Sequence, residues 1–315
     1  MFPSFESILP ILQPSFSAAD KQRKNTKKKQ LITNIVFGLI IIGFYLLTKN
    51  IFIVAFSLFF CMFLRSIVFN RMNYKFKKTY ADLFITKLVD ALFQNYKSPE
   101  DDGEFTYHAT YNPNEHIKKN ELYQSNYFGQ NYMVSGEDYI EGQLGLTTFK
   151  LSEIHVMDSG DSSDDKITTV FEGVVFIADF NNFFEGSTYI YRRKFLANTH
   201  AHVKSIGAYK IELTDHDFNK EFVVMTTDDV EARYILSTNF VRKLMEYSHT
   251  TDGKAEFTFV DNKMFIFRRT TKDQFSGQLH NSNDEARLRE IYDDFLEYFS
   301  IVDELTLNRR IWSKA

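Results

Sequence analysis

The sequence predicts an α+β protein, with an N-terminal pair of apolar helices followed by an antiparallel-sheet domain flanked by helices. Two long apolar runs, 31–47 and 51–69, are separated by three residues. Further along the chain, short segments rich in β-branched and aromatic residues are bounded by turn residues, which is typical of strands. Other segments repeat apolar residues every three or four positions, which is typical of helices.

The composition is that of a chain with a packed core. Its 315 residues are 44% hydrophobic, and 33 Phe and 17 Tyr exclude a globally disordered chain. A single Cys excludes a disulfide scaffold. Of the 37 Lys+Arg and 41 Asp+Glu, residues 1–70 hold 8 and 2, which leaves 29 and 39, a net charge of −10, for residues 71–315. This acidic balance argues against nucleic acid as a partner.

The two apolar runs predict a transmembrane helical hairpin. At about 1.5 Å per residue each run spans roughly 25–29 Å, close to the hydrocarbon core of a bilayer at about 30 Å. Thr48-Lys49-Asn50 provides the turn. The predicted organisation is an N-terminal tail with a basic run (1–30), the hairpin (31–69, with helices 31–47 and 51–69), a juxtamembrane helix (70–98) and a soluble α+β domain (99–315).

Basic residues indicate the orientation of the hairpin. The membrane-flanking set is Lys27, Lys28, Lys29, Lys49, Arg65 and Arg71. Only Lys49 lies in the turn, so the positive-inside rule predicts that both termini are cytosolic, at the cytoplasmic (inner) membrane. Arg65 is expected to anchor the second helix at the interface. The basic run 21–29 has a second interpretation, a docking patch for anionic lipid, although topology alone explains it.

The N-terminal twenty residues fit no cleaved signal peptide, because they lack early positive charge and their short apolar stretch is broken by Pro10 and Pro14. Their apolar side chains are expected either in the membrane interface or in a disordered tail. Cys61, inside the second apolar run, is compatible with a reducing compartment.

The soluble part alternates between helical and strand patterns. Helices are predicted at 72–97, 113–123, 228–247 (capped by Thr227, with a break at 237–239) and 283–308. Strands are predicted at 145–156, 167–178, 187–195, 209–213, 221–226, 255–260 and 264–269. Residues 179–186 are expected to join two of these strands as a hairpin loop, and 215–219 to form a turn.

The candidate metal ligands are His200, His202, Asp215 and His216. Alternate residues of a strand would place both histidines of the H-x-H pair on one face, which suits a divalent ion. The surrounding residues resemble a loop, however, and no third ligand lies at a characteristic spacing, so solvated histidines are favoured and no metal or cofactor is predicted. The acidic loop 158–165 lacks the ligand positions of an EF-hand and is interpreted as solvated.

Arg233 interrupts a fairly apolar helical stretch. A buried arginine needs a carboxylate partner, and Glu172, Asp179 and Asp228 are the candidates. This predicts a structural role for Arg233.

Four segments of the soluble part resemble the bacterial membrane protein family known as domain of unknown function 3137, some members of which carry the label galanin. They are EDYIEG (137–142), FEGVVFIADFN (171–181), DVEARYIL (229–236) and LNRRIW (307–312). The resemblance implies a membrane-tethered cytosolic domain. It implies no activity, because it carries over no catalytic residue.

These observations favour a non-enzymatic function: a membrane-anchored cytosolic binding or scaffold module with an unidentified protein or lipid partner. The sequence contains no G-x-S-x-G, G-x-x-x-x-G-K-[ST] or G-x-G-x-x-G pattern. One alternative is a metal-dependent hydrolase tethered to the inner membrane through the His/Asp candidates. The other is an oligomeric transport-associated subunit, because two helices alone line no pathway.

Overall fold

The computed structural model describes residues 1–97, 106–129, 132–158, 167–179, 185–193, 204, 206–251, 254–271, 275, 279 and 285–304. The chain divides into two compact units. The sheet unit comprises Met1–Phe2, Phe93–Asp273 and Asp293–Ala315, and the hairpin unit comprises Pro3–Leu92 and Gln274–Tyr292.

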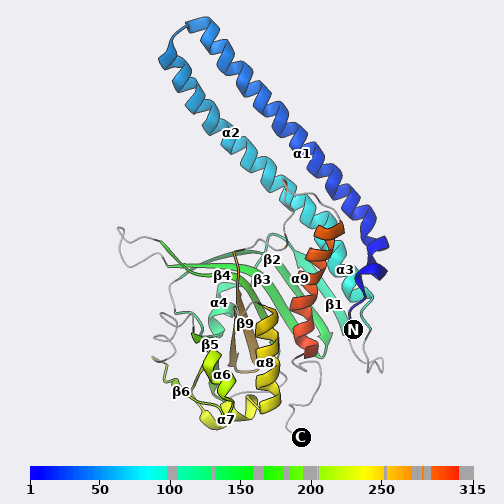
Figure 1. Cartoon of the computed structure of the whole chain (residues 1–315), viewed down its shortest axis with the longest axis vertical. Coiled ribbons are helices and arrows are strands. Elements are labelled where there is room, and N and C mark those ends of the chain that lie inside the picture. Colours follow the sequence, from blue (N-terminus) through cyan, green and yellow to red (C-terminus); the bar gives the residue numbers. More distant parts are fainter. Residues whose placement is uncertain are drawn as a thin grey trace. The chain divides into compact units, whose positions relative to one another are not determined.

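The hairpin unit is built on two long helices, α1 (Phe5–Thr48) and α2 (Ile51–Tyr80), which run antiparallel (Figure 1). Lys49 ends α1 in the left-handed conformation, with φ of 48°, and its backbone N–H donates to the Tyr45 carbonyl. The Asn50 side chain then caps α2 by accepting from the Phe52 N–H at 2.9 Å. The predicted break between the two apolar runs is confirmed.

Helix α1 begins far earlier than predicted. Phe5, Ile8 and Leu12 are buried, and the Phe16 ring contacts the Phe84 ring at 6.1 Å between centroids. The expectations of an interfacial or a disordered segment are therefore wrong for these residues. Their spacing of three and four positions forms an apolar face, and that face packs against protein.

The helical pattern after the second apolar run is confirmed. Helix α2 continues through a π-helical turn, η1 (Ala81–Ile85), into α3 (Thr86–Gln94). Phe76, Tyr80, Phe84, Leu88 and Leu92 are buried at every fourth position, which is the periodicity that predicted this helix.

The sheet unit contains one nine-stranded sheet in the described residues, in which neighbouring strands pair antiparallel. The strands are β1 (Thr106–Asn112), β2 (Met133–Gly145), β3 (Thr147–Asp158), β4 (Thr168–Asp179), β5 (Ser187–Arg192), β6 (Tyr209–Ile211), β7 (Phe222–Thr226), β8 (Ala255–Val260) and β9 (Lys263–Arg269). Their order is β1-β2-β3-β4-β9-β8-β5-β7-β6. This antiparallel sheet, together with the helices of the chain, confirms the predicted α+β fold class.

The described helices after β1 are α4 (Lys119–Gln124), α6 (His216–Glu221), α7 (Asp229–Ile235), α8 (Thr238–Thr250) and α9 (Glu285–Glu304). The predicted break near 237–239 is confirmed, because Ser237 caps α8. The cap of α7 is Asp228 rather than Thr227. The predicted turn at 215–219 is instead the start of α6.

One prediction about strand pairing and one about the extent of a helix are wrong. Strands β4 and β5 form no hairpin, because the β8–β9 hairpin lies between them in the sheet. The helix expected at 113–123 is only α4, because Asn112 ends strand β1 and its side-chain oxygen accepts from the Asn114 N–H at 3.0 Å, which forms a turn.

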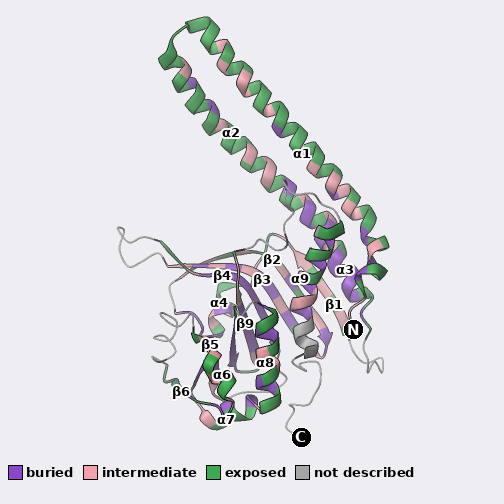
Figure 2. Cartoon of the chain, viewed as in Figure 1, coloured by how far each residue is buried: buried purple, intermediate pink, exposed green. Residues whose placement is uncertain are grey.

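The main core lies on one face of the sheet. Figure 2 shows the strands largely buried. The Tyr127 ring stacks on Phe267 at 4.0 Å between centroids, and Phe171 and Val175 of β4 belong to the same cluster. On the other face Phe149 contacts Phe299 of α9 at 5.5 Å.

Candidate functional sites

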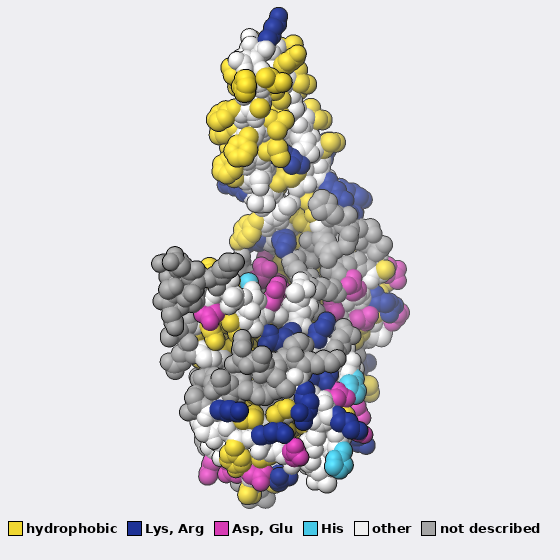
Figure 3. Space-filling model, turned by 60° about the vertical axis from the view of Figure 1, so that its left-hand side comes forward, with side chains coloured by type: hydrophobic (Ala, Val, Ile, Leu, Met, Phe, Trp, Pro, Cys, Tyr) yellow, Lys and Arg dark blue, Asp and Glu magenta, His cyan; other side chains and the backbone are white. Residues whose placement is uncertain are grey.

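The first candidate site is the apolar surface of the hairpin. Most large apolar side chains between residues 31 and 68 are exposed, up to 85% for Leu47 and 82% for Phe52. Both helices are long and apolar enough to cross a membrane. Figures 2 and 3 show this exposed apolar band on the hairpin. A continuous apolar patch of this size marks an interaction with a membrane or another protein.

Only a narrow seam of the hairpin is buried. On α2 the seam follows Val54, Ser57, Cys61 and Leu64, at alternating spacings of three and four; Ser57 and Cys61 are buried, and Val54 and Leu64 are half-buried. Between residues 31 and 69, most of the remaining large apolar side chains of the two helices are exposed.

Two polar contacts fix the register of the helices near their open end. The Gln30 side-chain amide donates to Asn73 at 2.8 Å, and the Arg65 guanidinium donates to Asn34 at 2.6 Å. Arg65 also lies 4.4 Å from the centre of the Phe69 ring. These contacts hold the basic segments of α1 and α2 at the same level of the hairpin.

Charge on the hairpin has one sign. Residues 21–81 contain no Asp or Glu. Their basic residues are Lys21, Arg23, Lys24, Lys27, Lys28, Lys29, Lys49, Arg65, Arg71, Lys75, Lys77 and Lys78. All but Lys49 and Arg65 lie beyond the apolar band on the side away from the turn. Figure 3 shows basic side chains below the apolar surface of the hairpin and at its tip.

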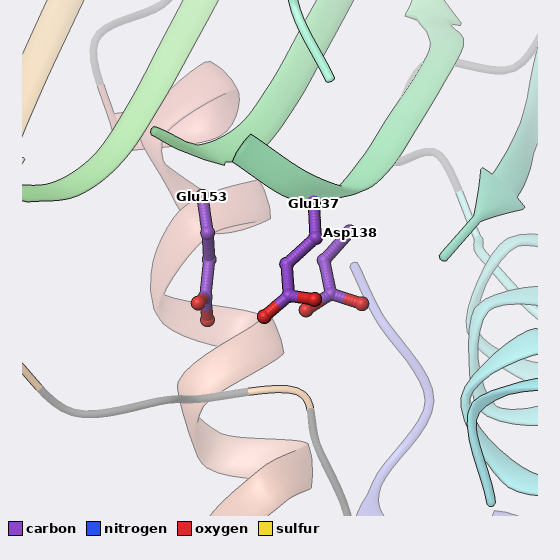
Figure 4. A group of neighbouring side chains, drawn as sticks. All are labelled: Glu137, Asp138 and Glu153. Atoms are coloured by element: carbon purple, nitrogen blue, oxygen red, sulfur yellow. The ribbon is translucent and has the colours of Figure 1, made fainter. Parts of the chain in front are cut away.

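The second candidate site is a group of three carboxylates on the sheet, Glu137, Asp138 and Glu153 (Figure 4). One oxygen from each lies within 4.8 Å of the others. Glu137 of β2 is directly opposite Glu153 of β3, and a bulge between Glu137 and Ile140 adds Asp138 to the same side. The bulge places Asp138 in the left-handed conformation, with φ of 61°.

Asp138 is the buried member of the group, with 4% of its surface exposed. It accepts a hydrogen bond from the Tyr111 hydroxyl. Burial, followed by the charge of Asp138, raises the pKa of the Tyr111 phenol far above its usual range. The hydrogen bond from Tyr111 therefore accounts for the burial of the Asp138 carboxylate.

Beside these carboxylates a cavity of about 390 Å³ opens across three strands. Its walls include Glu137, Glu153, His155 and Glu172. Oxygen ligands at this spacing suit a hard cation such as Ca²⁺ or Mg²⁺. The register of β2 and β3 creates the group, so the sequence alone offered no signal beyond the adjacent acidic residues.

The metal candidates from the sequence are not assembled into a site within the described residues. Asp215 caps α6, where its carboxylate accepts from Asp217 N at 3.0 Å and Phe218 N at 2.9 Å. His216 is the exposed first residue of that helix. His200 and His202 lie outside the described residues, as does the acidic stretch 159–165.

The expectation that Arg233 is buried is wrong. Its side chain is 47% exposed and pairs with Asp229 at 2.8 Å, one turn earlier on α7. Its neighbours Ala232 and Ile235 supply the buried face of this helix, so Arg233 faces outward.

Glu256 forms a buried polar cluster that the sequence did not reveal. Its side chain is 1% exposed and accepts from the Tyr127 hydroxyl, while the Arg192 backbone N–H donates to its other oxygen at 3.0 Å. The Arg269 guanidinium lies 3.8 Å away and donates to the Tyr127 hydroxyl at 3.2 Å. Burial raises the pKa of the Glu256 carboxyl, against the opposing effects of Tyr127 and Arg269.

The molecule thus combines an antiparallel α+β sheet unit with a helical hairpin that has the length and composition of two membrane spans. Residues 169–307 match the model of the family described as "Protein of unknown function (DUF3137)". The resemblance drawn from the sequence is confirmed over this part of the chain, which includes the segments 171–181 and 229–236.

No curated protein matches the chain. A solved structure, the mycobacterial trehalose monomycolate transport factor A, TtfA, is similar at 13% identity and a TM-score of 0.30, covering 59% of this chain and 79% of its own. A likeness at this level carries no conclusion about function.

Proposed function

We propose that this protein is an integral membrane protein whose hairpin crosses the cytoplasmic membrane twice and tethers the sheet unit in the cytosol as a binding or scaffold module. The observation that carries the proposal is the exposed apolar band, which ends at basic residues of both helices. Lipid would cover this band, and the basic residues would remain on the cytosolic side.

The physical argument for insertion rests on apolar area. Leaving large apolar side chains in water costs about 25 cal/mol per Å² of apolar surface. The helices satisfy their own backbone hydrogen bonds, which a bilayer requires. A signal sequence would end after one apolar run, whereas this chain has two that pair through a three-residue turn.

The argument for a binding module is the organisation of the sheet unit. Its core is filled by aromatic side chains, and its buried carboxylates Asp138 and Glu256 have partners within the fold. The alternative of a tethered metal-dependent hydrolase remains a hypothesis about residues 200–216, in which Asp215 is engaged as a helix cap. A transport-associated role requires several copies of the hairpin.

Insertion and topology are tested with single cysteines in a Cys61→Ser background. Lys49→Cys probes the hairpin turn, and Thr214→Cys probes an exposed position of the sheet unit. In intact bacterial cells producing the full chain, a membrane-impermeant maleimide is expected to label Lys49→Cys and to label Thr214→Cys only after lysis. Membranes washed with alkaline carbonate should retain the protein.

Labelling of Thr214→Cys in intact cells would show that the topology is the opposite of the one proposed. Release of the unmodified chain by carbonate would refute the proposal that the hairpin anchors the protein in the membrane. Carbonate release together with monomeric behaviour in detergent-free buffer would show that the apolar band is covered by protein.

A further inference from the structure

The basic residues at the open end of the hairpin form a compact surface contributed by both helices. We define the basic collar as Lys27, Lys28 and Lys29 of α1 together with Arg71, Lys75 and Lys78 of α2. All six side chains are exposed, and none has an ion pair with a carboxylate in the part of the chain that the structure describes.

The collar has a defined geometry because the two helices are locked in register. The Gln30–Asn73 hydrogen bond at 2.8 Å joins the residue after Lys29 to a residue between Arg71 and Lys75. Cations from two helices therefore gather at one level. The nearest acidic residue on α1, Asp20, is engaged by Arg23 and Lys24 and leaves the collar unneutralised.

Apolar surface begins directly beside the collar. Leu31 and Ile32 follow Lys29 and are 60% and 50% exposed, and Val68 precedes Arg71 on the other helix. A ligand that fits both features carries an anionic group and an acyl chain side by side. A soluble polyanion would satisfy the charges and leave the apolar side chains in water.

We infer that the basic collar is a binding surface for anionic phospholipid headgroups, such as phosphatidylglycerol, whose acyl chains lie along the adjoining apolar band. This inference rests on the proposed membrane insertion and goes beyond it, because topology requires only that the charges stay in the cytosol. Several basic residues at one level of a membrane interface attract anionic headgroups selectively.

The test uses the full chain purified in a neutral detergent and mixed with equal amounts of phosphatidylglycerol and phosphatidylcholine that carry the same acyl chains. Mass spectrometry of the bound lipid gives the ratio of the two. Each basic residue near an anionic surface corresponds to roughly a fivefold preference. We expect the unmodified chain to enrich phosphatidylglycerol at least about fivefold, and this enrichment to fall at high salt.

Two collar variants should each lower the enrichment at least about fivefold, because each removes three of the six basic residues. They are Lys27→Gln/Lys28→Gln/Lys29→Gln on α1 and Arg71→Gln/Lys75→Gln/Lys78→Gln on α2. The matched control is Lys118→Gln/Lys119→Gln/Lys204→Gln, three exposed lysines of the sheet unit, which should keep the full enrichment.

The inference is overturned if the unmodified chain shows no enrichment, if the collar variants keep it, or if the control loses it equally. Displacement of the lipid by millimolar inorganic phosphate would also overturn it, because the surface would then recognise free phosphate. Carbonate extraction of the same variants separates the two proposals: retention in the membrane with no lipid preference defeats only the lipid surface.

Discussion

The hairpin and the sheet unit are both rich in large apolar side chains, but the sheet unit buries them and the hairpin exposes them. In the sheet unit Val175, Phe171 and Phe267 are fully buried among other side chains. In the hairpin Leu39 is 62% exposed and Phe56 73% exposed. The same residue types thus serve an internal core in one region and an external surface in the other.

The two regions also differ in the burial of their charged groups. The sheet unit buries Glu256 and Asp138 and provides each with hydrogen-bond partners. The hairpin leaves the six cations of the basic collar exposed, and the polar contacts that join α1 to α2, Gln30 to Asn73 and Arg65 to Asn34, lie near the open end. The hairpin therefore has the polarity expected of a membrane segment, with apolar residues outward and charges at its border.

The largest expected effect compares one charge introduced into each apolar region. Val175→Asp places an unpaired carboxylate in the core and should abolish folding of the sheet unit or cost more than about 4 kcal/mol. Leu39→Asp should leave the thermal unfolding of the sheet unit unchanged and reduce membrane retention, since an Asp at the centre of a membrane helix costs about 3 kcal/mol. Circular dichroism in detergent and carbonate extraction measure the two effects. Equal destabilisation by both substitutions would mean that Leu39 faces a protein core.

The second prediction concerns the buried polar cluster. Glu256→Ala removes the carboxylate beside Arg269 and should lower the unfolding free energy by about 3–5 kcal/mol, because the partly buried Arg269 guanidinium loses its counter-charge and the buried Tyr127 hydroxyl loses its acceptor. Glu246→Ala is the matched control, since Glu246 is 68% exposed and its pairing with Arg242 at 3.8 Å is expected to contribute less than about 0.5 kcal/mol. Urea unfolding of the full chain in detergent measures both. A cost for Glu256→Ala no larger than that of the control would show that the cluster contributes nothing.

The sequence was sufficient for the apolar helical runs and the turn of the hairpin, but insufficient for the start of α1 at Phe5 and for the sheet order. Apolar runs and four-residue periodicity are local signals, and they predicted α2, α3 and the turn at Thr48–Asn50. Strand order depends on contacts far apart in sequence. The β8–β9 hairpin pairs with β4 and β5 although it begins 63 residues after the end of β5 at Arg192, at Ala255.

The group of three carboxylates could not be predicted from the sequence for the same reason, because it depends on the register of two paired strands. Glu137 and Glu153 become neighbours only through the pairing of β2 with β3, and Asp138 joins them only through the bulge. Strand β2 was missed because its three glycines and three acidic residues weaken the strand pattern. Arg233, by contrast, was misjudged although its position between Ala232 and Ile235 contains enough periodicity to place it on the outer face.

The smallest expected effect tests the buried member of the carboxylate group through its partner. Tyr111→Phe removes the hydrogen bond to Asp138 and should lower the unfolding free energy by about 2 kcal/mol at neutral pH. Because the pKa of the Tyr111 phenol is raised in the folded state, its contribution is complete below the unfolded pKa of about 10 and is lost as the pH rises above it.

The difference between the unmodified chain and Tyr111→Phe should therefore be constant from pH 7 to about 9.5 and then shrink by at most about 1.4 kcal/mol per pH unit. Urea midpoints across this range measure it, with Tyr234→Phe, at a 51% exposed position, as the control that should change little. A difference that grows above pH 10 would mean that the folded state favours the ionised phenol. Such a result would contradict the hydrogen bond that the neutral Tyr111 phenol donates to Asp138, because ionisation of the phenol replaces this bond by repulsion between two anions.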